Sequence, residues 1–158
     1  SFSGLVFYWG IKKEFPELET HNIFFSKDYK KEFEDLFDNK IIHNDPTVYI
    51  YISSKLNKND APAGKENWFV MVNAPYIQGQ DWKIEINKAR KKIVNKINTL
   101  LNTEIENFIE FENVLSPIDI QNKTGSFLGS IYGISSNDKF AAFMRQSNES
   151  KTIKNLYL

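Results

Sequence analysis

The sequence has 158 residues, 41% hydrophobic and 25% charged, a composition that favours one globular domain over a disordered segment. Its 20 basic residues balance 20 acidic ones, so the net charge of zero provides no overall field to attract nucleic acid. The absence of cysteine excludes disulfides and thiolate metal sites and fits a reducing cytoplasm, and no apolar run is long enough to span a membrane.

The first third of the chain predicts two strands and a helix. Residues 3–11 are rich in Val, Phe, Tyr and Trp and predict a buried strand, and residues 21–25 predict a second, shorter one. Ser26 or Asp28 is suited to cap the helix that follows. The side chains expected on one face of that helix, from their spacing, are Tyr29, Phe33, Leu36 and Phe37.

The next two strands flank a polar loop. Alternation along residues 47–53 predicts a strand with two different sides. One side carries aliphatic residues and the other aromatic ones, namely Val48, Ile50 and Ile52 against Tyr49 and Tyr51. Residues 55–65 form a polar loop, and residues 68–74 predict a strand that Pro75 stops. The loop is short enough for the two strands to pair antiparallel.

The second half of the chain begins with the longest predicted helix. Asp81 or its neighbour starts a helix that runs to about Leu101, with the basic residues of segment 88–96 expected to face water. Its apolar stripe is expected to contain Ile86, Ala89, Ile93, Ile97, Leu100 and Leu101. Residues 108–115 predict a further strand, and Pro117 opens a short helix that runs through Gln121.

The order of these elements predicts an α+β fold, in which a mixed, largely antiparallel sheet carries helices packed on one face. Residues 156–158 are expected to begin one more strand. No internal repeat or linker interrupts the sequence, so residues 1–158 are expected to form a single domain.

Few residues carry recognisable chemistry. Gly125, Gly129 and Gly133 follow one another at four-residue spacing but do not match the dinucleotide-binding fingerprint, so turns or close packing explain them better than a ligand does. His21 and His43 lie far apart without ligand-type neighbours, so no metal site is expected. The sequence shows no self-contained active site, and its catalytic residues stay unassigned.

A set of motifs runs along the whole chain. SFSGLVFYWG at residues 1–10 is followed by HNIFFSKDYK at 21–30, DPTVY at 45–49 and APAG at 61–64. GSIYG at residues 129–133 and FMR at 143–145 complete the set. Taken together, these motifs resemble the bacterial carotenoid desaturases of the phytoene desaturase type. Residues 135–145 are most similar to the hydroxycarotenoid 3,4-desaturases within that family.

The resemblance implies an enzyme that binds FAD and oxidises a carbon–carbon single bond of a carotenoid to a double bond. This chain would be its substrate-binding domain, with the fold of the flavin amine oxidases and phytoene desaturases. The residues implied to contact substrate or to face the flavin are Gly129, Tyr132, Gly133, Phe143 and Arg145. From the residues alone, Arg145 is either a buried anchor near a site or a helix-end charge.

The family's two flavin-binding segments are a dinucleotide fingerprint and a second Gly/Pro-rich segment, and both are expected outside residues 1–158. The chain by itself is therefore expected to bind no FAD and to be inactive alone. Its partners would be a carotenoid and the FAD-binding domain of the same polypeptide. Apolar surface made for that domain would promote self-association. Phe2 departs from the family's pattern, which has a small residue or Cys at this position.

Two other interpretations stay open at this point. One is a stand-alone module that binds an apolar ligand or a partner protein. The other is a different reaction of the same superfamily, namely that of a carotenoid or retinoid isomerase, oxidase or saturase. In either enzyme reading, the complete protein is expected in the cytoplasm, peripherally associated with the membrane.

Overall fold

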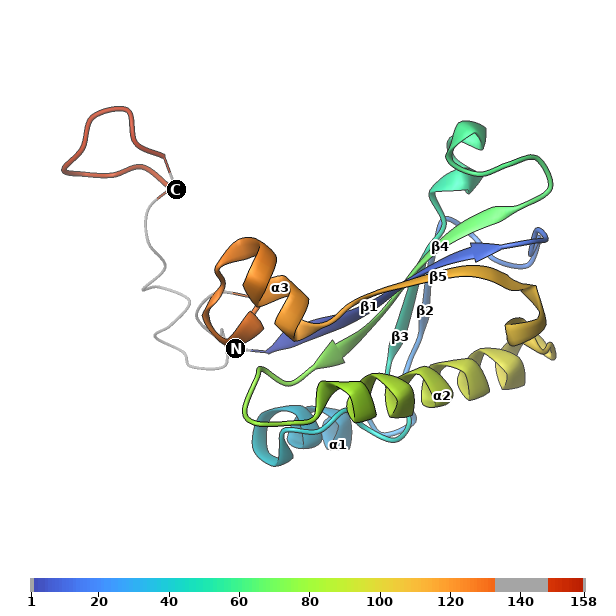
Figure 1. The fold of residues 1–158 in the computed structure, drawn as a ribbon, viewed down its shortest axis with the longest axis horizontal. Helices are drawn as coiled ribbons and strands as arrows, with labels where there is room; N and C mark the ends of the chain where they lie inside the picture. The colour runs from blue at the N-terminus through green and yellow to red at the C-terminus, as the bar shows by residue number, and fades with distance from the viewer. Residues whose placement is uncertain (1, 133–147, 158) are drawn as a thin grey trace.

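The computed structural model describes residues 2–132 and 148–157, and Figure 1 shows their arrangement. Five strands form one sheet in the order β2-β3-β4-β1-β5, and all of their pairings are antiparallel. The strands are β1 (Ser3–Ile11), β2 (His21–Phe24), β3 (Val48–Tyr51), β4 (Glu66–Ala74) and β5 (Ile109–Leu115). The helices are α1 (Tyr29–Glu34), α2 (Trp82–Leu101) and α3 (Pro117–Thr124). The predicted α+β class is confirmed.

The long strand β1 joins the two halves of the sheet. It pairs with β4 on one side and with β5 on the other, so Phe7 lies opposite both Val70 and Val114. β-branched and aromatic side chains at these positions suit a pleated, buried surface. The strands β3 and β4 pair antiparallel across the polar loop, as the sequence predicts.

One face of the sheet is covered by α2, which runs along it below the strands in Figure 1. The helix begins where predicted, because Asp81 accepts hydrogen bonds from the backbone N–H groups of Lys83 and Ile84. Its buried side chains and those of the covered sheet face form one core, which includes Leu5, Phe7, Trp9, Val48, Ile50, Trp68, Val70, Ala89, Ile93 and Ile97.

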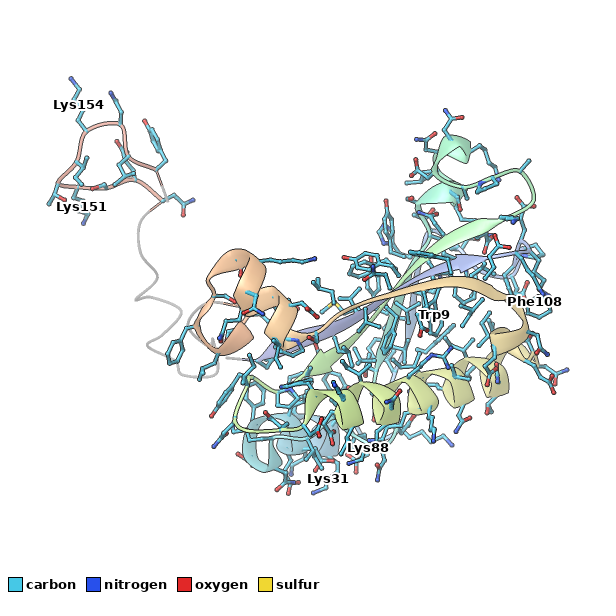
Figure 2. All side chains as sticks on the ribbon, in the orientation of Figure 1. Trp9, Lys31, Lys88, Phe108, Lys151 and Lys154 are labelled. Atoms are coloured by element: carbon cyan, nitrogen blue, oxygen red, sulfur yellow. The ribbon has the colours of Figure 1, made fainter. Side chains whose placement is uncertain are left out.

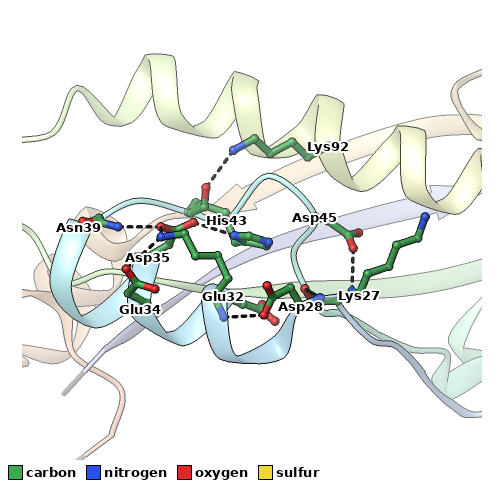
Figure 3. Close-up of polar contacts among 12 residues, drawn as sticks. Lys27, Asp28, Glu32, Glu34, Asp35, Asn39, His43, Asp45 and Lys92 are labelled. Carbon is green, nitrogen blue, oxygen red and sulfur yellow. Dashed lines mark hydrogen bonds and ion pairs between the residues drawn. The ribbon is translucent and has the colours of Figure 1, made fainter.

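The basic cluster of α2 is less exposed than the sequence predicts. Lys88 points away from the sheet, as expected (Figure 2). Lys92 instead turns toward the segment before β3, where its Nζ donates a hydrogen bond of 2.9 Å to the carbonyl oxygen of Ile42 (Figure 3). Burial lowers the pKa of Lys92. The predicted apolar stripe is wrong at Leu100, which is 55% exposed.

Lys96 also leaves the wet face of α2. Its Nζ donates hydrogen bonds to the carbonyl oxygens of Phe25 and Pro46 and to a carboxylate oxygen of Asp45. These contacts join α2 to the segments that follow β2 and precede β3. Tertiary contacts therefore decide the position of this lysine, because its long stem lets the ammonium group reach carbonyls on neighbouring segments.

The helix α1 is short because it continues as a π-helical turn. Asp28 caps α1 by accepting a hydrogen bond from the backbone N–H of Lys31. The turn Asp35–Asn39 follows and ends at Lys40, which adopts a left-handed φ of 57°. Asp35 lies 2.7 Å from Nδ1 of His43 (Figure 3). The hydrogen bond with His43 holds the pKa of Asp35 below its ordinary value.

The last described elements lie beyond β5. Ser116 and Asp119 form a capping box at the start of α3, with Pro117 in the first turn, and the helix extends to Thr124 instead of Gln121. Tyr157 pairs with Glu149 in an isolated bridge where the sequence predicts the start of a strand. In the described part of the chain, no helix is both long and apolar enough to cross a membrane.

Candidate functional site

The candidate site is the sheet face turned away from α2, called the open face here. Successive residues of a strand point to opposite faces of the sheet. The residues that alternate with the buried core residues along each strand therefore lie on the open face. The strand register places Tyr8, Tyr49, Tyr51, Phe69, Phe111 and His21 on it. In Figure 1, α2 lies on the opposite side of the sheet, and α3 lies beside the start of β1. A Cβ at Gly4 would lie 3.1 Å from Ile131, so the segment after α3 covers that end of the open face.

A row of ring contacts crosses four strands of the open face. The ring of Tyr8 on β1 lies 5.6 Å from that of Phe69 on β4, which lies 6.2 Å from Tyr49 on β3. His21 on β2 stacks on both Tyr49 and Tyr51, at 6.1 and 4.9 Å. Such pairs prefer edge or offset contacts at these distances. The row therefore presents a continuous aromatic surface across the sheet.

The open face is electrically neutral along its strands. On β1, the open-face positions from Gly4 to Gly10 carry no charged side chain. The positions paired with them on the neighbouring strands β2 to β4 carry no Asp, Glu, Lys or Arg either. The hydroxyl of Tyr49 lies 2.7 Å from Nδ1 of His21. Burial raises the pKa of Tyr49, so its hydroxyl stays protonated at neutral pH. An uncharged, flat, apolar ligand is the kind that this surface suits.

A hollow of about 340 Å³ lies at one end of the row. Its wall includes Tyr8, Tyr51, Asn67, Phe69 and Phe111. A side chain at Gly10 would place its Cβ 3.1 Å from that of Phe111, so glycine lets this aromatic ring lie across β1. Among the residues that the structure describes, no group of His, Asp and Glu could hold a metal ion.

The residues implied by the family resemblance lie elsewhere. Tyr132 is 49% exposed, and its ring lies 4.5 Å from that of Phe2, near the start of β1. Gly129 is close by, and its carbonyl accepts a hydrogen bond from Ser3 Oγ. The structure thus brings Tyr132 and Gly129 close to each other, but it does not bring them close to the aromatic row. Gly133, Phe143 and Arg145 lie outside the described residues, so their roles stay predictions.

Gly129 has a clear packing role. Its φ is +70°, and a Cβ there would lie 2.3 Å from the carbonyl oxygen of Pro117. Only glycine fits such a position, because any side chain meets both a backbone clash and a strained left-handed conformation. This observation agrees with the sequence-based preference for close packing at this glycine.

The aromatic row is the part of the site that sequence reasoning missed. Alternation separates Tyr49 and Tyr51 from their aliphatic neighbours, and the same alternation sets Phe69 apart from Trp68. The signal was thus present in each strand. The sequence did not indicate which side the helices cover, and that choice decides which aromatic residues form the core.

The described residues do not fit an FAD site by themselves. Of the described helices, α2 and α3 are long enough for their N-termini to receive a phosphate, but the carboxylates of Asp81 and Asp119 already lie at these ends. In the described segments no glycine-rich turn joins a strand to a helix with dinucleotide spacing. That the chain alone binds no FAD stays a prediction for experiment.

Comparison with known proteins identifies the relatives of the chain, although no family model matches it. The similarities place it with carotenoid desaturases and oxygenases, so the family resemblance is confirmed. It is 54% identical, over 99% of its length, to a 1-hydroxycarotenoid 3,4-desaturase of a Flavobacterium species. It is 33% and 34% identical to 4,4'-diaponeurosporene oxygenases of Staphylococcus haemolyticus and Staphylococcus aureus, over 98% of its length. The chain spans about a third of each relative, namely 32%, 31% and 31%.

Proposed function

We propose that this chain is the substrate-binding portion of an FAD-dependent carotenoid desaturase and is inactive alone. The observation that carries the proposal is the neutral aromatic row on the open face, from Tyr8 to Tyr51. A conjugated polyene is flat, apolar and uncharged, so it can stack on such rings without leaving a polar group unpaired. The similarity to a carotenoid desaturase supports this class of ligand.

The chain's own residues would bind and orient the polyene. The rings of Tyr8, Phe69 and Tyr49 form a floor, and the remaining polypeptide would close over it and exclude water. FAD, when bound by that remaining polypeptide, supplies the redox chemistry. Because the open face carries no charge near the row, it would neither solvate ions nor stabilise water beside the reacting carbons.

The partners and location follow from this role. The complete enzyme would consist of this domain and an FAD-binding domain that faces the aromatic row. We place it in the cytoplasm, peripherally associated with the membrane in which carotenoids dissolve. Without the FAD-binding domain, the exposed row would favour self-association of the isolated chain.

A second candidate reaction is oxygenation of a carotenoid. The similarity to two staphylococcal 4,4'-diaponeurosporene oxygenases favours it as the alternative. The open face would hold the polyene in the same manner for either reaction. The product formed by the complete enzyme decides between them, because desaturation adds a double bond and oxygenation adds oxygen.

The test uses the complete enzyme with FAD and carotenoids in lipid vesicles. We expect a desaturated product, and we expect Tyr8→Ala to raise KM about threefold to tenfold through the loss of one ring from the row. Ile84→Ala is the matched control, because Ile84 is an exposed apolar residue on α2. Absence of any carotenoid product, or equal KM values for both variants and wild type, would contradict the proposal.

A further inference from the structure

A second hollow lies between the C-terminal half of α2 and the segments that follow β2 and precede β3. Its volume is about 530 Å³. Because α2 lies on the side of the sheet away from the open face, the proposed binding of a polyene does not use this hollow, called the helix-side hollow here. Its charged and large apolar wall residues are Phe25, Lys27, Asp45, Lys92, Lys96 and Leu100.

The helix-side hollow carries an excess of positive charge. Three lysines and one carboxylate line it. Both oxygens of Asp45 are engaged, Oδ1 by the ammonium group of Lys96 and Oδ2 by the backbone N–H of Lys27, each at 2.8 Å. Within the described part of the chain, the ammonium groups of Lys27 and Lys92 form no ion pair. The wall therefore presents two cations to whatever occupies the hollow.

Lys92 has donors left for a further acceptor. Its ammonium group donates to the carbonyl oxygen of Ile42, and the remaining N–H groups have no recorded partner among the described residues. Burial lowers the pKa of Lys92, and an anion beside it would offset that cost. In Figure 3, Lys27 points toward α2 from the facing segment. The hollow therefore suits an anion with several acceptor oxygens, such as a phosphate.

Large apolar side chains flank these lysines. Phe25 is 65% exposed and Leu100 is 55% exposed, and both belong to the wall of the hollow. Tyr29 extends this apolar rim, because its ring lies 6.3 Å from that of Phe25 and is also exposed. Exposed aromatic and aliphatic side chains beside lysines suit the boundary between water and lipid. There the apolar groups enter the acyl layer and the ammonium groups meet phosphates.

From these contacts we infer that the helix-side hollow is the surface by which the complete enzyme docks on an anionic lipid bilayer. Lys27 and Lys92 bind a lipid phosphate, while Phe25 and Leu100 enter the acyl layer. A soluble phosphate compound matches the charges but leaves both apolar side chains in water, so a lipid is the occupant that uses both features. The open face stays free for the FAD-binding domain. The inference rests on the proposed function and specifies the docking surface and the charge of the lipid.

The test measures sedimentation of the complete enzyme with vesicles of phosphatidylcholine, either alone or mixed with phosphatidylglycerol. We expect the mixed, anionic vesicles to bind more enzyme. Lys27→Gln should weaken binding to the mixed vesicles about fivefold and leave binding to the neutral ones unchanged, because it removes one cation near an anionic surface. Phe25→Ser should weaken binding to both kinds of vesicle about fivefold to tenfold, because it removes an apolar anchor.

The matched controls are Lys123→Gln and Leu56→Ser. Lys123 on α3 and Leu56 in the connection between β3 and β4 are exposed, and neither lines the hollow. We expect both variants to bind vesicles as wild type does. Inorganic phosphate, compared with chloride at equal ionic strength, should not release the enzyme from the mixed vesicles. Release would identify a site for soluble phosphate and overturn the assignment to lipid.

Thermal unfolding separates docking from folding. Lys27→Gln changes an exposed charge, so it tests the surface even if Phe25→Ser lowers the melting temperature. Equal binding to the two kinds of vesicle overturns the inference, and so does a Lys27→Gln variant that binds as the controls do. If wild type binds the mixed vesicles but converts no carotenoid dissolved in them, the proposed function fails while the docking surface stands, so the two failures are distinct.

Discussion

The two faces of the sheet are built from the same strands but differ in what covers them. On β4, Trp68 and Val70 are buried under α2, whereas the alternating Phe69 and Met71 are only half-buried. Both faces are apolar, yet only one is needed for a core. The comparison teaches that the hydrophobicity of a strand has two uses here, and that tertiary packing separates them.

The part of the apolar open face that remains uncovered carries a cost in water. Large exposed apolar patches in soluble proteins usually mark sites for a ligand or a partner. The rings on the open face contact one another from Tyr8 to Tyr51, so they form one patch instead of scattered exposed residues. We therefore expect substitutions on the covered face to change stability, and substitutions on the open face to change binding.

The largest effect is expected from neighbours on β4. Trp68→Ala should lower the free energy of unfolding by about 3–5 kcal/mol, because it opens a cavity in the core. Phe69→Ala should lower it by about 1 kcal/mol, since it removes only cross-strand ring contacts, but it should weaken carotenoid binding. Urea denaturation and carotenoid titration measure the two effects. Equal losses of stability in the two variants would abolish the distinction between the faces.

An intermediate loss of stability is expected from a lysine of α2, the helix that covers the other face of the sheet. Lys96→Met should lower the free energy of unfolding by about 2 kcal/mol, because two carbonyl groups and Oδ1 of Asp45 lose the ammonium group that donates to them. Lys91→Met is the matched control on the same helix, since Lys91 is exposed; we expect a change within about 0.5 kcal/mol. Urea denaturation of both variants checks this, and a similar change in each would show that the Lys96 contacts contribute nothing.

The smallest effect concerns pH. The pKa of Asp35 is held below its ordinary value of about 3.9 by hydrogen bonds from His43 and Asn39. A depressed folded-state pKa contributes stability that is complete above the ordinary value and is lost as the pH falls through the folded-state value. The melting temperatures of wild type and Asp35→Asn should therefore converge below about pH 4. A difference that is constant from pH 7 to pH 2 would rule out this contribution.

Much of the fold could be read from local signals. Asp81 and Pro117 mark the starts of α2 and α3, because the signals for a helix start act within the first turn. The pairing of β3 with β4 followed from their alternation and the short loop. The π-helical turn after α1 was not predicted, because its contacts include His43, which lies beyond the helix.

Contacts between distant segments were less accessible to local reasoning. Lys92 and Lys96 were expected in water, but carbonyl groups of other segments draw them inward. The hydroxyl of Ser54 is buried without a hydrogen-bond partner, and the sequence does not indicate this. Neither observation has a signature in spacing or composition, since both depend on atoms from distant parts of the chain.

The sequence by itself determined the strands, the caps, the neutral charge and the family, because each depends on residue type and local spacing. The tertiary structure alone decided which aromatic side chains lie in the core and which remain on the open face. The reason is geometric: a strand offers two alternating sides, and only the position of α2 makes one of them the interior.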